Sequence, residues 1–170
     1  LADFKRACKP YPSHLSAANS PALLGWPETH LDWVRPGYML YGNSPFGQES
    51  HPSTEALRPV MTLSSGVISI SQVATGEAVG YASTWIAERA SVIATVTIGY
   101  GDGYPRNAKN GTPVLVNGQR ARLVGRVSMD MITIDITDLK NVSIGDTVTL
   151  WGEGLPVAEV AHWSDTIGYE

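Results

Sequence analysis

Alternating apolar and polar positions run through the chain from about residue 61 onward and predict a series of short β-strands. Side chains that alternate with a period of two point to opposite faces of a strand, which suits a sheet with one buried face. This pattern covers residues 61–73, 77–81, 92–98, 114–116, 119–124, 129–136 and 147–151. The pair Asn117-Gly118 between two of these segments predicts a two-residue hairpin, because both turn positions take positive φ. Many short strands joined by turns are typical of a small barrel or sandwich.

The first third of the chain carries a weaker pattern, which predicts a short helix and two short strands. These elements cover residues 2–8, 13–15 and 32–42. A segment rich in Ser, Pro and Gly follows over residues 43–56, and such a shift in composition is typical of a boundary. We therefore expect one domain over residues 1–57 and a second, mainly β domain over residues 58–170.

One of the predicted strands begins with a carboxylate. A period of two places Asp130 on the same face as Ile132, Ile134 and Ile136. A carboxylate on an apolar face is costly unless it is paired with a charge or hydrogen-bonded. Asp130 is therefore either a paired group or the solvated start of the strand.

Composition narrows the class of protein. The chain has 170 residues, of which 43% are hydrophobic and 16% charged, as is usual for a globular domain. A net charge of −4 argues against a nucleic-acid surface, which is normally basic. No apolar run reaches the roughly 18 residues of a membrane helix, so no membrane span is expected. The single cysteine, Cys8, cannot form an internal disulfide, which fits a reducing compartment and a cytoplasmic location.

Metal and nucleotide motifs find no support in the sequence. Glycines at 99, 101 and 103 recur at every second position, which differs from the spacing of dinucleotide-binding loops. The four histidines are scattered, and the aspartates of residues 130–138 lack the spacing of a calcium loop. We therefore expect no metal site.

Two other motifs carry the most information. They are Gly99-Tyr100-Gly101-Asp102-Gly103-Tyr104-Pro105-Arg106 and Gly125-Arg126-Val127-Ser128-Met129-Asp130-Met131. Further motifs accompany them in the family's order and spacing: Ala18-Asn19-Ser20, Val34-Arg35-Pro36-Gly37, Leu40-Tyr41-Gly42, Val79-Gly80-Tyr81 with Thr84-Trp85, and Leu150-Trp151-Gly152. Through these motifs the chain resembles the bacterial alanine racemase family from residue 13 to its end. The family uses pyridoxal 5'-phosphate (PLP) to interconvert L- and D-alanine.

The resemblance implies a fold, an assembly and a missing part. Family members consist of an N-terminal α/β barrel and a mostly β C-terminal domain, and they act as head-to-tail homodimers. We therefore expect a small β-barrel-like domain preceded by the last strand–helix units of an incomplete α/β (TIM-type) barrel. A complete barrel of that type needs about 200 residues, whereas residues 1–57 supply only its end. Both ends of the chain look cut, and no signal peptide is evident.

The family's Schiff-base lysine lies on the first barrel strand, and the resemblance places it before Leu1. The lysines of this sequence match nothing in that role; they are Lys5, Lys9, Lys109 and Lys140. We therefore expect a fragment of the enzyme that lacks the covalent PLP site and is inactive alone.

The resemblance also assigns roles to residues of this sequence. Tyr81 matches the tyrosine base that the partner subunit supplies, on the face of the substrate opposite the lysine. Arg35 matches the arginine that faces the pyridine nitrogen of PLP. An unpaired arginine in an apolar strand-like run would be expensive, which speaks against an ordinary surface role for Arg35. The residues that match the phosphate site of PLP are Asn19, Ser20, Gly37, Tyr38 and Tyr169.

Further matches concern the substrate. The backbone N–H of Met129 matches the group that meets the substrate carboxylate, and Asp130 matches a carboxylate that orients groups near Tyr81. Tyr100, Arg106 and Arg126 match residues at the entrance to the active site, where the two arginines would attract an amino-acid carboxylate. From the residues alone, Tyr81 is an ordinary strand tyrosine, Asn19-Ser20 a turn or helix cap, and Met129 a core methionine.

We therefore expect an alanine racemase that supplies D-alanine for peptidoglycan or interconverts it in catabolism. Two alternatives remain open. One is a racemase of the same fold with broader amino-acid specificity, which a screen of serine, lysine and arginine would distinguish. The other is a non-catalytic dimerisation or binding module, which the sequence upstream of Leu1 would distinguish.

Overall fold

The computed structural model describes residues 1–47 and 51–170, and these form two compact units. The first unit comprises Leu1–Val60 together with Tyr169, and the second comprises Met61–Gly168 together with Glu170. We describe each unit by itself.

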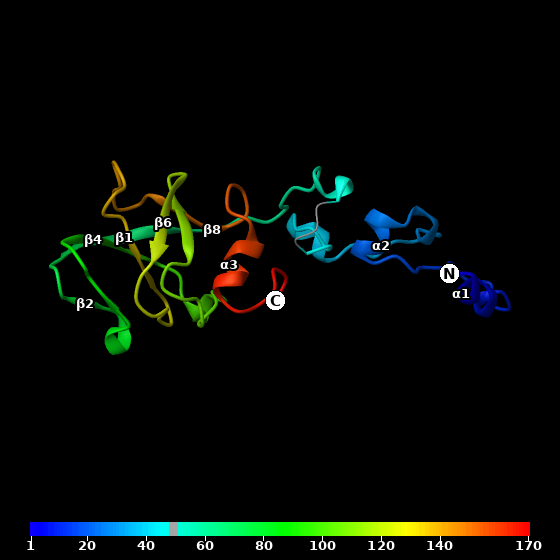
Figure 1. Ribbon diagram of the computed structural model, residues 1–170, viewed down its shortest axis with the longest axis horizontal. Helices are drawn as coiled ribbons and strands as arrows, with labels where there is room; N and C mark the ends of the chain where they lie inside the picture. Colours follow the sequence, from blue (N-terminus) through cyan, green and yellow to red (C-terminus); the bar gives the residue numbers. More distant parts are fainter. Residues whose placement is uncertain (48–50) are drawn as a thin grey trace. The chain divides into compact units, whose positions relative to one another are not determined.

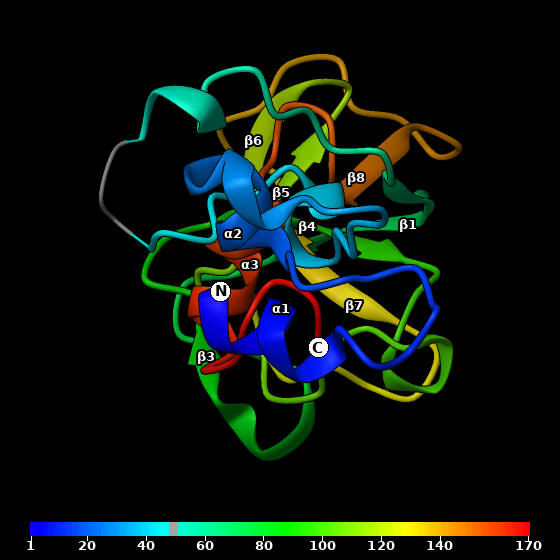
Figure 2. The same cartoon turned by 90° about the vertical axis from the view of Figure 1, so that its right-hand side faces the viewer.

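The second unit is built on a closed antiparallel barrel of six strands, in the order β1-β4-β7-β6-β5-β8 (Figures 1 and 2). The strands are β1 (Leu63–Val73), β4 (Ser91–Val96), β5 (Pro113–Val116), β6 (Gln119–Leu123), β7 (Ile132–Asp135) and β8 (Thr147–Trp151). This barrel confirms the predicted fold class, which expected a small β-barrel-like domain.

Strand β1 closes the barrel by changing partner along its length. Its first residues, Leu63–Gly66, pair with β8, and the residues from Val67 onward pair with β4. The register shifts once in each pairing, between Leu63 and Ser64 and between Val67 and Ser69. Such irregularities bend a strand, as the closure of a small barrel requires.

The inward faces of the strands form the hydrophobic core. Its fully buried members include Val96, Val114, Leu123, Ile134 and Leu150, which come from five different strands. β-Branched and leucine side chains that alternate along each strand fill the interior, as the period-two pattern predicted. The sequence pattern and the core therefore agree.

The hairpin between β5 and β6 forms as predicted. Asn117 and Gly118 have φ values of 49° and 78°, so both turn residues take the left-handed conformation. Outside the barrel lie a two-stranded sheet, β2 (Ala78–Val79) with β3 (Trp85–Ile86), and helix α3 (Val157–Trp163).

The first unit contains helices α1 (Ala2–Cys8) and α2 (Ser20–Gly25) and the 3₁₀ helices η1 (Pro27–Thr29), η2 (Tyr38–Tyr41) and η3 (Pro52–Thr54). The strands predicted at 13–15 and 32–42 are wrong, because only an isolated parallel bridge between Ser16 and Trp33 forms there. Among its described residues, the first unit buries only Ala18, Ser20 and Asn43. Strands of a parallel barrel need partners on both sides, and one bridge does not supply them.

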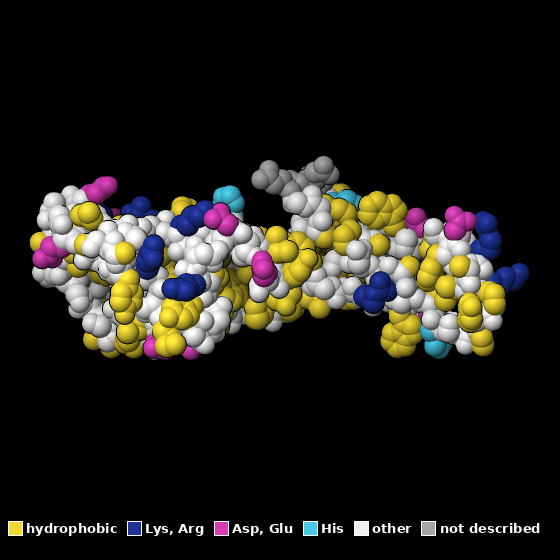
Figure 3. Space-filling model, turned by 90° about the horizontal axis from the view of Figure 1, so that it is seen from below, with side chains coloured by type: hydrophobic (Ala, Val, Ile, Leu, Met, Phe, Trp, Pro, Cys, Tyr) yellow, Lys and Arg dark blue, Asp and Glu magenta, His cyan; other side chains and the backbone are white. Residues whose placement is uncertain are grey.

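The surface carries charges of both signs. On the face that Figure 3 shows, basic and acidic side chains are interspersed. No helix within residues 1–47 and 51–170 is both long enough and apolar enough to cross a membrane.

Candidate active site

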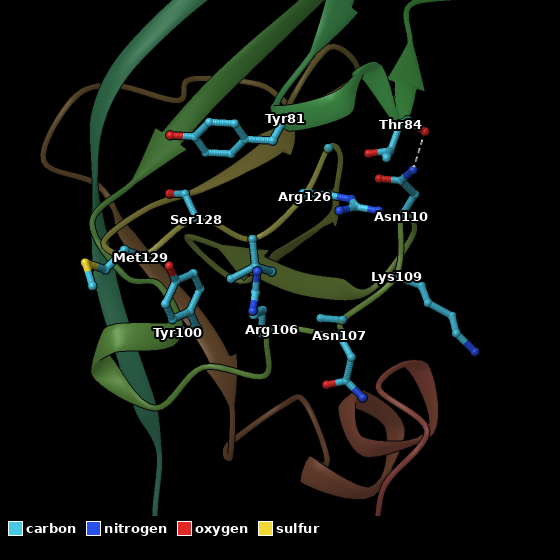
Figure 4. Close-up of a pocket in the computed structure, with 13 residues that line it drawn as sticks. Tyr81, Thr84, Tyr100, Arg106, Asn107, Lys109, Asn110, Arg126, Ser128 and Met129 are labelled. Carbon is cyan, nitrogen blue, oxygen red and sulfur yellow. Dashed lines mark hydrogen bonds between the residues drawn. The ribbon is translucent and has the colours of Figure 1, made fainter.

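An open pocket of about 1100 Å³ lies in the second unit. Five residues singled out from the sequence line it together, and Figure 4 shows how their side chains lie around it. They are Tyr81, Tyr100, Arg106, Arg126 and Met129. These residues come from three segments far apart in the sequence, so the barrel fold brings them together.

Tyr81 lies on a sharp turn and not on the predicted strand. Strand β2 ends at Val79, and Tyr81 begins the 3₁₀ turn η4 (Tyr81–Ser83). The backbone takes positive φ at Gly80 (80°), Ala82 (60°) and Ser83 (50°). Residues other than glycine rarely adopt this conformation, and such strain is concentrated at functional sites. The turn leaves the Tyr81 side chain 72% exposed at the pocket.

Tyr100 and Arg106 form one wall of the pocket. Tyr100 begins the 3₁₀ turn η5 (Tyr100–Asp102), and the Gly99 N–H donates to Asp102 Oδ2 at 2.9 Å at the start of that turn. The Arg106 guanidinium lies over the Tyr100 ring, 5.1 Å from its centroid, within the range of a cation–π contact. Arg106 and Arg126 give the pocket two permanent positive charges. Such a pocket attracts anions, including carboxylates.

The loop that starts at Gly99 packs against the backbone of Ser128 and Met129. The Tyr100 N–H donates to the Ser128 carbonyl at 3.0 Å, and the Gly101 N–H donates to the Met129 carbonyl at 2.8 Å. The carbonyl and the N–H of a trans peptide point in opposite directions. Because the Ser128 carbonyl faces the loop, the Met129 N–H points away from it. That N–H has the orientation needed to bind an anion from the side opposite the loop.

Gly99 makes this packing possible. A Cβ at Gly99 would lie 2.2 Å from the Met129 carbonyl oxygen and 2.4 Å from the Ser128 carbonyl oxygen. The Gly99 backbone is extended, with φ −147°, so the close approach and not the dihedral angle requires glycine here.

Asp130 differs from its expected placement. Strand β7 begins only at Ile132, and Asp130 lies exposed in the bend before it. The alternative of a solvated strand start is therefore the one observed, and the predicted shared face with Ile132 is wrong. Asp130 is absent from the lining of the pocket, and within residues 1–47 and 51–170 no hydrogen bond joins it to Tyr81.

The first unit brings together most of the residues expected to hold a phosphate group. The buried Ser20 Oγ accepts hydrogen bonds from the N–H groups of Gly37, at 3.0 Å, and Met39, at 3.3 Å. Asn19 caps helix α2 through a bond from the Ala22 N–H to its Oδ1 at 3.2 Å. The Gly37 and Met39 N–H groups are directed at Ser20 Oγ, and the Ser20 hydroxyl keeps its own hydrogen as a donor suited to a phosphate oxygen.

Tyr169 belongs to the same unit as this group. Its ring meets that of Tyr38 edge-on, with 5.0 Å between the ring centroids. A tyrosine hydroxyl is a suitable further donor to a phosphate oxygen. The hydroxyls of Ser20 and Tyr169 in the first unit are therefore of a kind that suits a phosphate group.

Arg35 lies on the surface of the first unit, which corrects the argument from burial. Its side chain is exposed, and its Nη1 donates to Ser16 Oγ at 2.6 Å. An exposed arginine has no desolvation cost to offset. The proposed role of Arg35 toward the pyridine nitrogen therefore depends on the family resemblance alone.

Sequence reasoning missed several residues of the pocket, namely Thr84, Asn107, Lys109, Asn110 and Ser128. Asn110 is the most informative, because its Nδ2 donates to the Thr84 carbonyl at 2.9 Å across the pocket rim (Figure 4). Lys109 Nζ is paired with Asp165 Oδ1 at 2.6 Å, and both side chains are more than half exposed. The run of polar residues directly after Arg106 was the available signal, but such runs also occur in ordinary loops.

Comparison with known proteins gives a consistent result. The family model described as the C-terminal domain of alanine racemase matches residues 60–170, and the one for the N-terminal domain matches residues 1–45. The alanine racemase of Pseudoalteromonas atlantica is 56% identical over 166 residues, which cover 98% of this chain and 44% of that protein.

Solved structures agree with the sequence comparison. The biosynthetic alanine racemase from Pseudomonas aeruginosa has a TM-score of 0.87 and 51% identity, covering 99% of this chain and 47% of its own. Alanine racemase from Bartonella henselae, with covalently bound pyridoxal phosphate, has a TM-score of 0.83 and 36% identity, covering 99% of this chain and 46% of its own. The chain spans about half the length of the relatives it matches.

Proposed function

The chain belongs to the alanine racemase family, and from this membership we propose that it forms the C-terminal half of an enzyme that interconverts L- and D-alanine. Within that enzyme, residues 1–57 complete the α/β barrel and residues 58–170 form the C-terminal domain. The observation that carries the proposal is the meeting of Tyr81, the two arginines and the Met129 backbone at one pocket.

Racemisation removes the α-proton of alanine and returns one to the opposite face. PLP, when bound, supplies the electron sink that makes this proton removable. Tyr81 takes and returns the proton on one face. In the family a lysine serves the other face, and we place it upstream of Leu1. Arg106 and Arg126 line the same pocket as Tyr81 and place positive charge beside the reacting proton.

Met129, Arg106 and Arg126 attract and bind the substrate carboxylate. Arg106 and Arg126 draw the amino acid toward the pocket, and the Met129 N–H, which points away from the Gly99 loop, donates to the carboxylate. Tyr100 narrows the entrance, where its ring is held by Arg106. These contacts fix the substrate so that its α-proton faces Tyr81.

The first unit would hold PLP. Ser20, Gly37 and Tyr38 would bind its phosphate, with Asn19 holding the turn before helix α2 and Tyr169 adding its hydroxyl. Arg35 would donate to the pyridine nitrogen. A guanidinium can only donate, so it leaves that nitrogen unprotonated and restrains the electron sink, which limits side reactions.

The active form is a homodimer in which Tyr81 serves the site of the partner subunit. This assembly follows the family and explains why Tyr81 is 72% exposed in a single chain. A cytoplasmic location completes the proposal, in keeping with the lone Cys8.

The experiment that tests this function is solvent-deuterium exchange at the α-carbon of L- and D-alanine. It uses the complete polypeptide that carries this chain, as wild type and as Tyr81→Phe. We expect the variant to lose exchange from L-alanine and to retain exchange from D-alanine, because only one of two bases is removed. Wild-type exchange from neither isomer would show that alanine is not the substrate. Wild-type rates in the variant would show that Tyr81 has a structural role.

A further inference from the structure

Among residues 1–47 and 51–170 of a single chain, no side chain forms a hydrogen bond that fixes the position of the Tyr81 hydroxyl. Within the described part of the chain, no hydrogen bond reaches it, and the side chain is largely exposed. A general base must lie within hydrogen-bond reach of the proton it removes. The backbone of the turn therefore decides where the hydroxyl lies, and the contacts that hold this turn decide how far it reaches.

One contact holds the start of the turn. Gly80 lies against the segment Gly125–Arg126, and a Cβ at Gly80 would lie 3.1 Å from the Arg126 nitrogen and 3.2 Å from the Gly125 Cα. The approach is close from the other side too, since a Cβ at Gly125 would lie 2.9 Å from the Val79 carbonyl oxygen. Two backbones meet here without side chains between them. Glycine is the residue that allows such an approach.

The segment that receives Gly80 is itself fixed to the barrel. Thr133 on strand β7 donates its hydroxyl to the Val124 carbonyl at 2.5 Å, and the Val124 N–H donates to the Thr133 carbonyl at 2.9 Å. The start of the Tyr81 turn therefore packs against a segment that is hydrogen-bonded to strand β7. Arg126, which lines the same pocket, belongs to this segment.

A second contact holds the end of the turn. Asn110 Nδ2 donates to the Thr84 carbonyl at 2.9 Å, as the dashed line in Figure 4 shows. The loop of Asn110 is anchored in turn, because the Gly111 N–H donates to the Leu123 carbonyl at 2.8 Å. Between the two contacts, Ala82 and Ser83 are held at positive φ. A strained turn persists only when its surroundings over-determine it.

We propose that Gly80, Gly125 and Asn110 are positioning residues that hold the Tyr81 turn from both ends and so set the reach of the Tyr81 hydroxyl. This inference rests on the proposed function, in which Tyr81 moves the α-proton on one face of alanine. An added methyl group at Gly80 separates the two backbones and displaces Tyr81, and loss of the Asn110 amide releases the end of the turn. Either change slows proton transfer only on the face of alanine that Tyr81 serves, because the base on the other face does not depend on this turn.

The test compares Gly80→Ala with Gly76→Ala in the complete polypeptide. Both glycines have positive φ, 80° and 87°, but a Cβ at Gly76 would meet nothing within 4 Å. Both variants place alanine at positive φ, and they differ in the close approach at Gly80 and in its ψ of 179°, a combination that is essentially restricted to glycine. Deuterium exchange at the α-carbon of each isomer is measured for both. We expect exchange from L-alanine to fall on the order of 10- to 100-fold in Gly80→Ala, with exchange from D-alanine and the Gly76→Ala variant near wild type.

Asn110→Ala keeps the contact between Gly80 and Gly125, so it tests the inference even if Gly80→Ala fails to fold. It should show the same one-sided loss, smaller in size, and Asn110→Asp should not restore the rate because a carboxylate cannot donate to the Thr84 carbonyl. Equal losses from both isomers in the folded variants, or Gly80→Ala rates equal to those of Gly76→Ala, would overturn the inference. A wild type that exchanges neither isomer would instead contradict the proposed function.

Discussion

The hydroxyl of Tyr104 lies in the barrel core without a hydrogen-bond partner among the described residues. The ring is 1% exposed and stacks on Trp151, with 6.1 Å between the ring centroids. Burial raises the pKa of the Tyr104 phenol well above its ordinary value, because the charged form would lose its hydration. A polar atom in this position costs free energy and contributes no bond in return.

We expect Tyr104→Phe to raise the free energy of unfolding by roughly 1 kcal/mol near neutral pH. The gain should grow above pH ~10, where the unfolded wild type releases the phenolic proton and the folded wild type retains it. The free energy of unfolding of the wild type is therefore unaffected by titration of this group below pH ~10 and falls as the pH rises above that value. Urea unfolding at several alkaline pH values measures the difference. Tyr11→Phe, at a residue with 70% exposure, is the control. Identical alkaline slopes for wild type and Tyr104→Phe would contradict this account.

Single residues also show the limit of reasoning from sequence. The family resemblance carried the roles of Tyr81 and Arg35, but the local pattern put Tyr81 on a strand and Arg35 in an apolar environment. The turn at Tyr81 depends on the contact of Gly80 with Gly125, two residues that are distant in sequence. The pattern of apolar and polar residues within one segment does not predict a contact between two segments that are far apart in sequence. Asn110 could not be predicted for the same reason, because its contact is the hydrogen bond to the Thr84 carbonyl, which lies far away in sequence.

At the scale of elements, the contact between the Gly99 loop and the Ser128–Met129 backbone has a measurable consequence. We expect Gly99→Ala to raise KM for both alanine isomers on the order of tenfold, or about 1.4 kcal/mol, because the methyl group pushes the Met129 peptide out of line. Steady-state kinetics of the complete polypeptide in both directions measures this. Unlike Gly80→Ala, the change should affect both isomers, since both present a carboxylate.

Gly103→Ala is the matched control within the same loop. Its φ is +93°, and a Cβ there would meet nothing within 4 Å. This variant should lose roughly 1 kcal/mol of stability through backbone strain and should keep its KM. Equal KM values for Gly99→Ala and wild type would show that the Met129 N–H is not held by this loop.

The elements of the barrel were predictable where a strand pairs with its neighbour in sequence. Asn117-Gly118 fixed the β5–β6 hairpin through the φ values that both residues accept. The predicted strands at 13–15 and 32–42 failed because a parallel barrel strand is completed by partners that may be far away in sequence, and here only Ser16 and Trp33 meet. The start of β7 was placed too early because Asp130 shares the period of the isoleucines without sharing their burial.

At the scale of the whole molecule, the two units differ in how much hydrophobic core each contains. The barrel unit has a continuous core, whereas the described part of the first unit buries Ala18, Ser20 and Asn43 and contains no strand. We expect hydrogen–deuterium exchange of this chain alone to be slow in β4 and β6 and fast across residues 1–47, since protection follows buried contacts. Exchange measured by mass spectrometry resolves the two units. Equal protection in both would contradict the view that the first unit depends on further barrel strands.

The change of partner along β1 has a consequence for synthesis. The half that pairs with β4 meets its partner soon, because Val73 pairs with Ser91. The half that pairs with β8 must wait for Thr147, and the roughly 80 residues after Gly66 take a ribosome about 4–16 s to add. The waiting half is Leu63-Ser64-Ser65-Gly66, whereas the early half carries Val67, Ile68 and Ile70. The nascent domain thus leaves its most hydrophilic edge open for longest, which lowers the chance that a neighbouring nascent chain adds a strand to it.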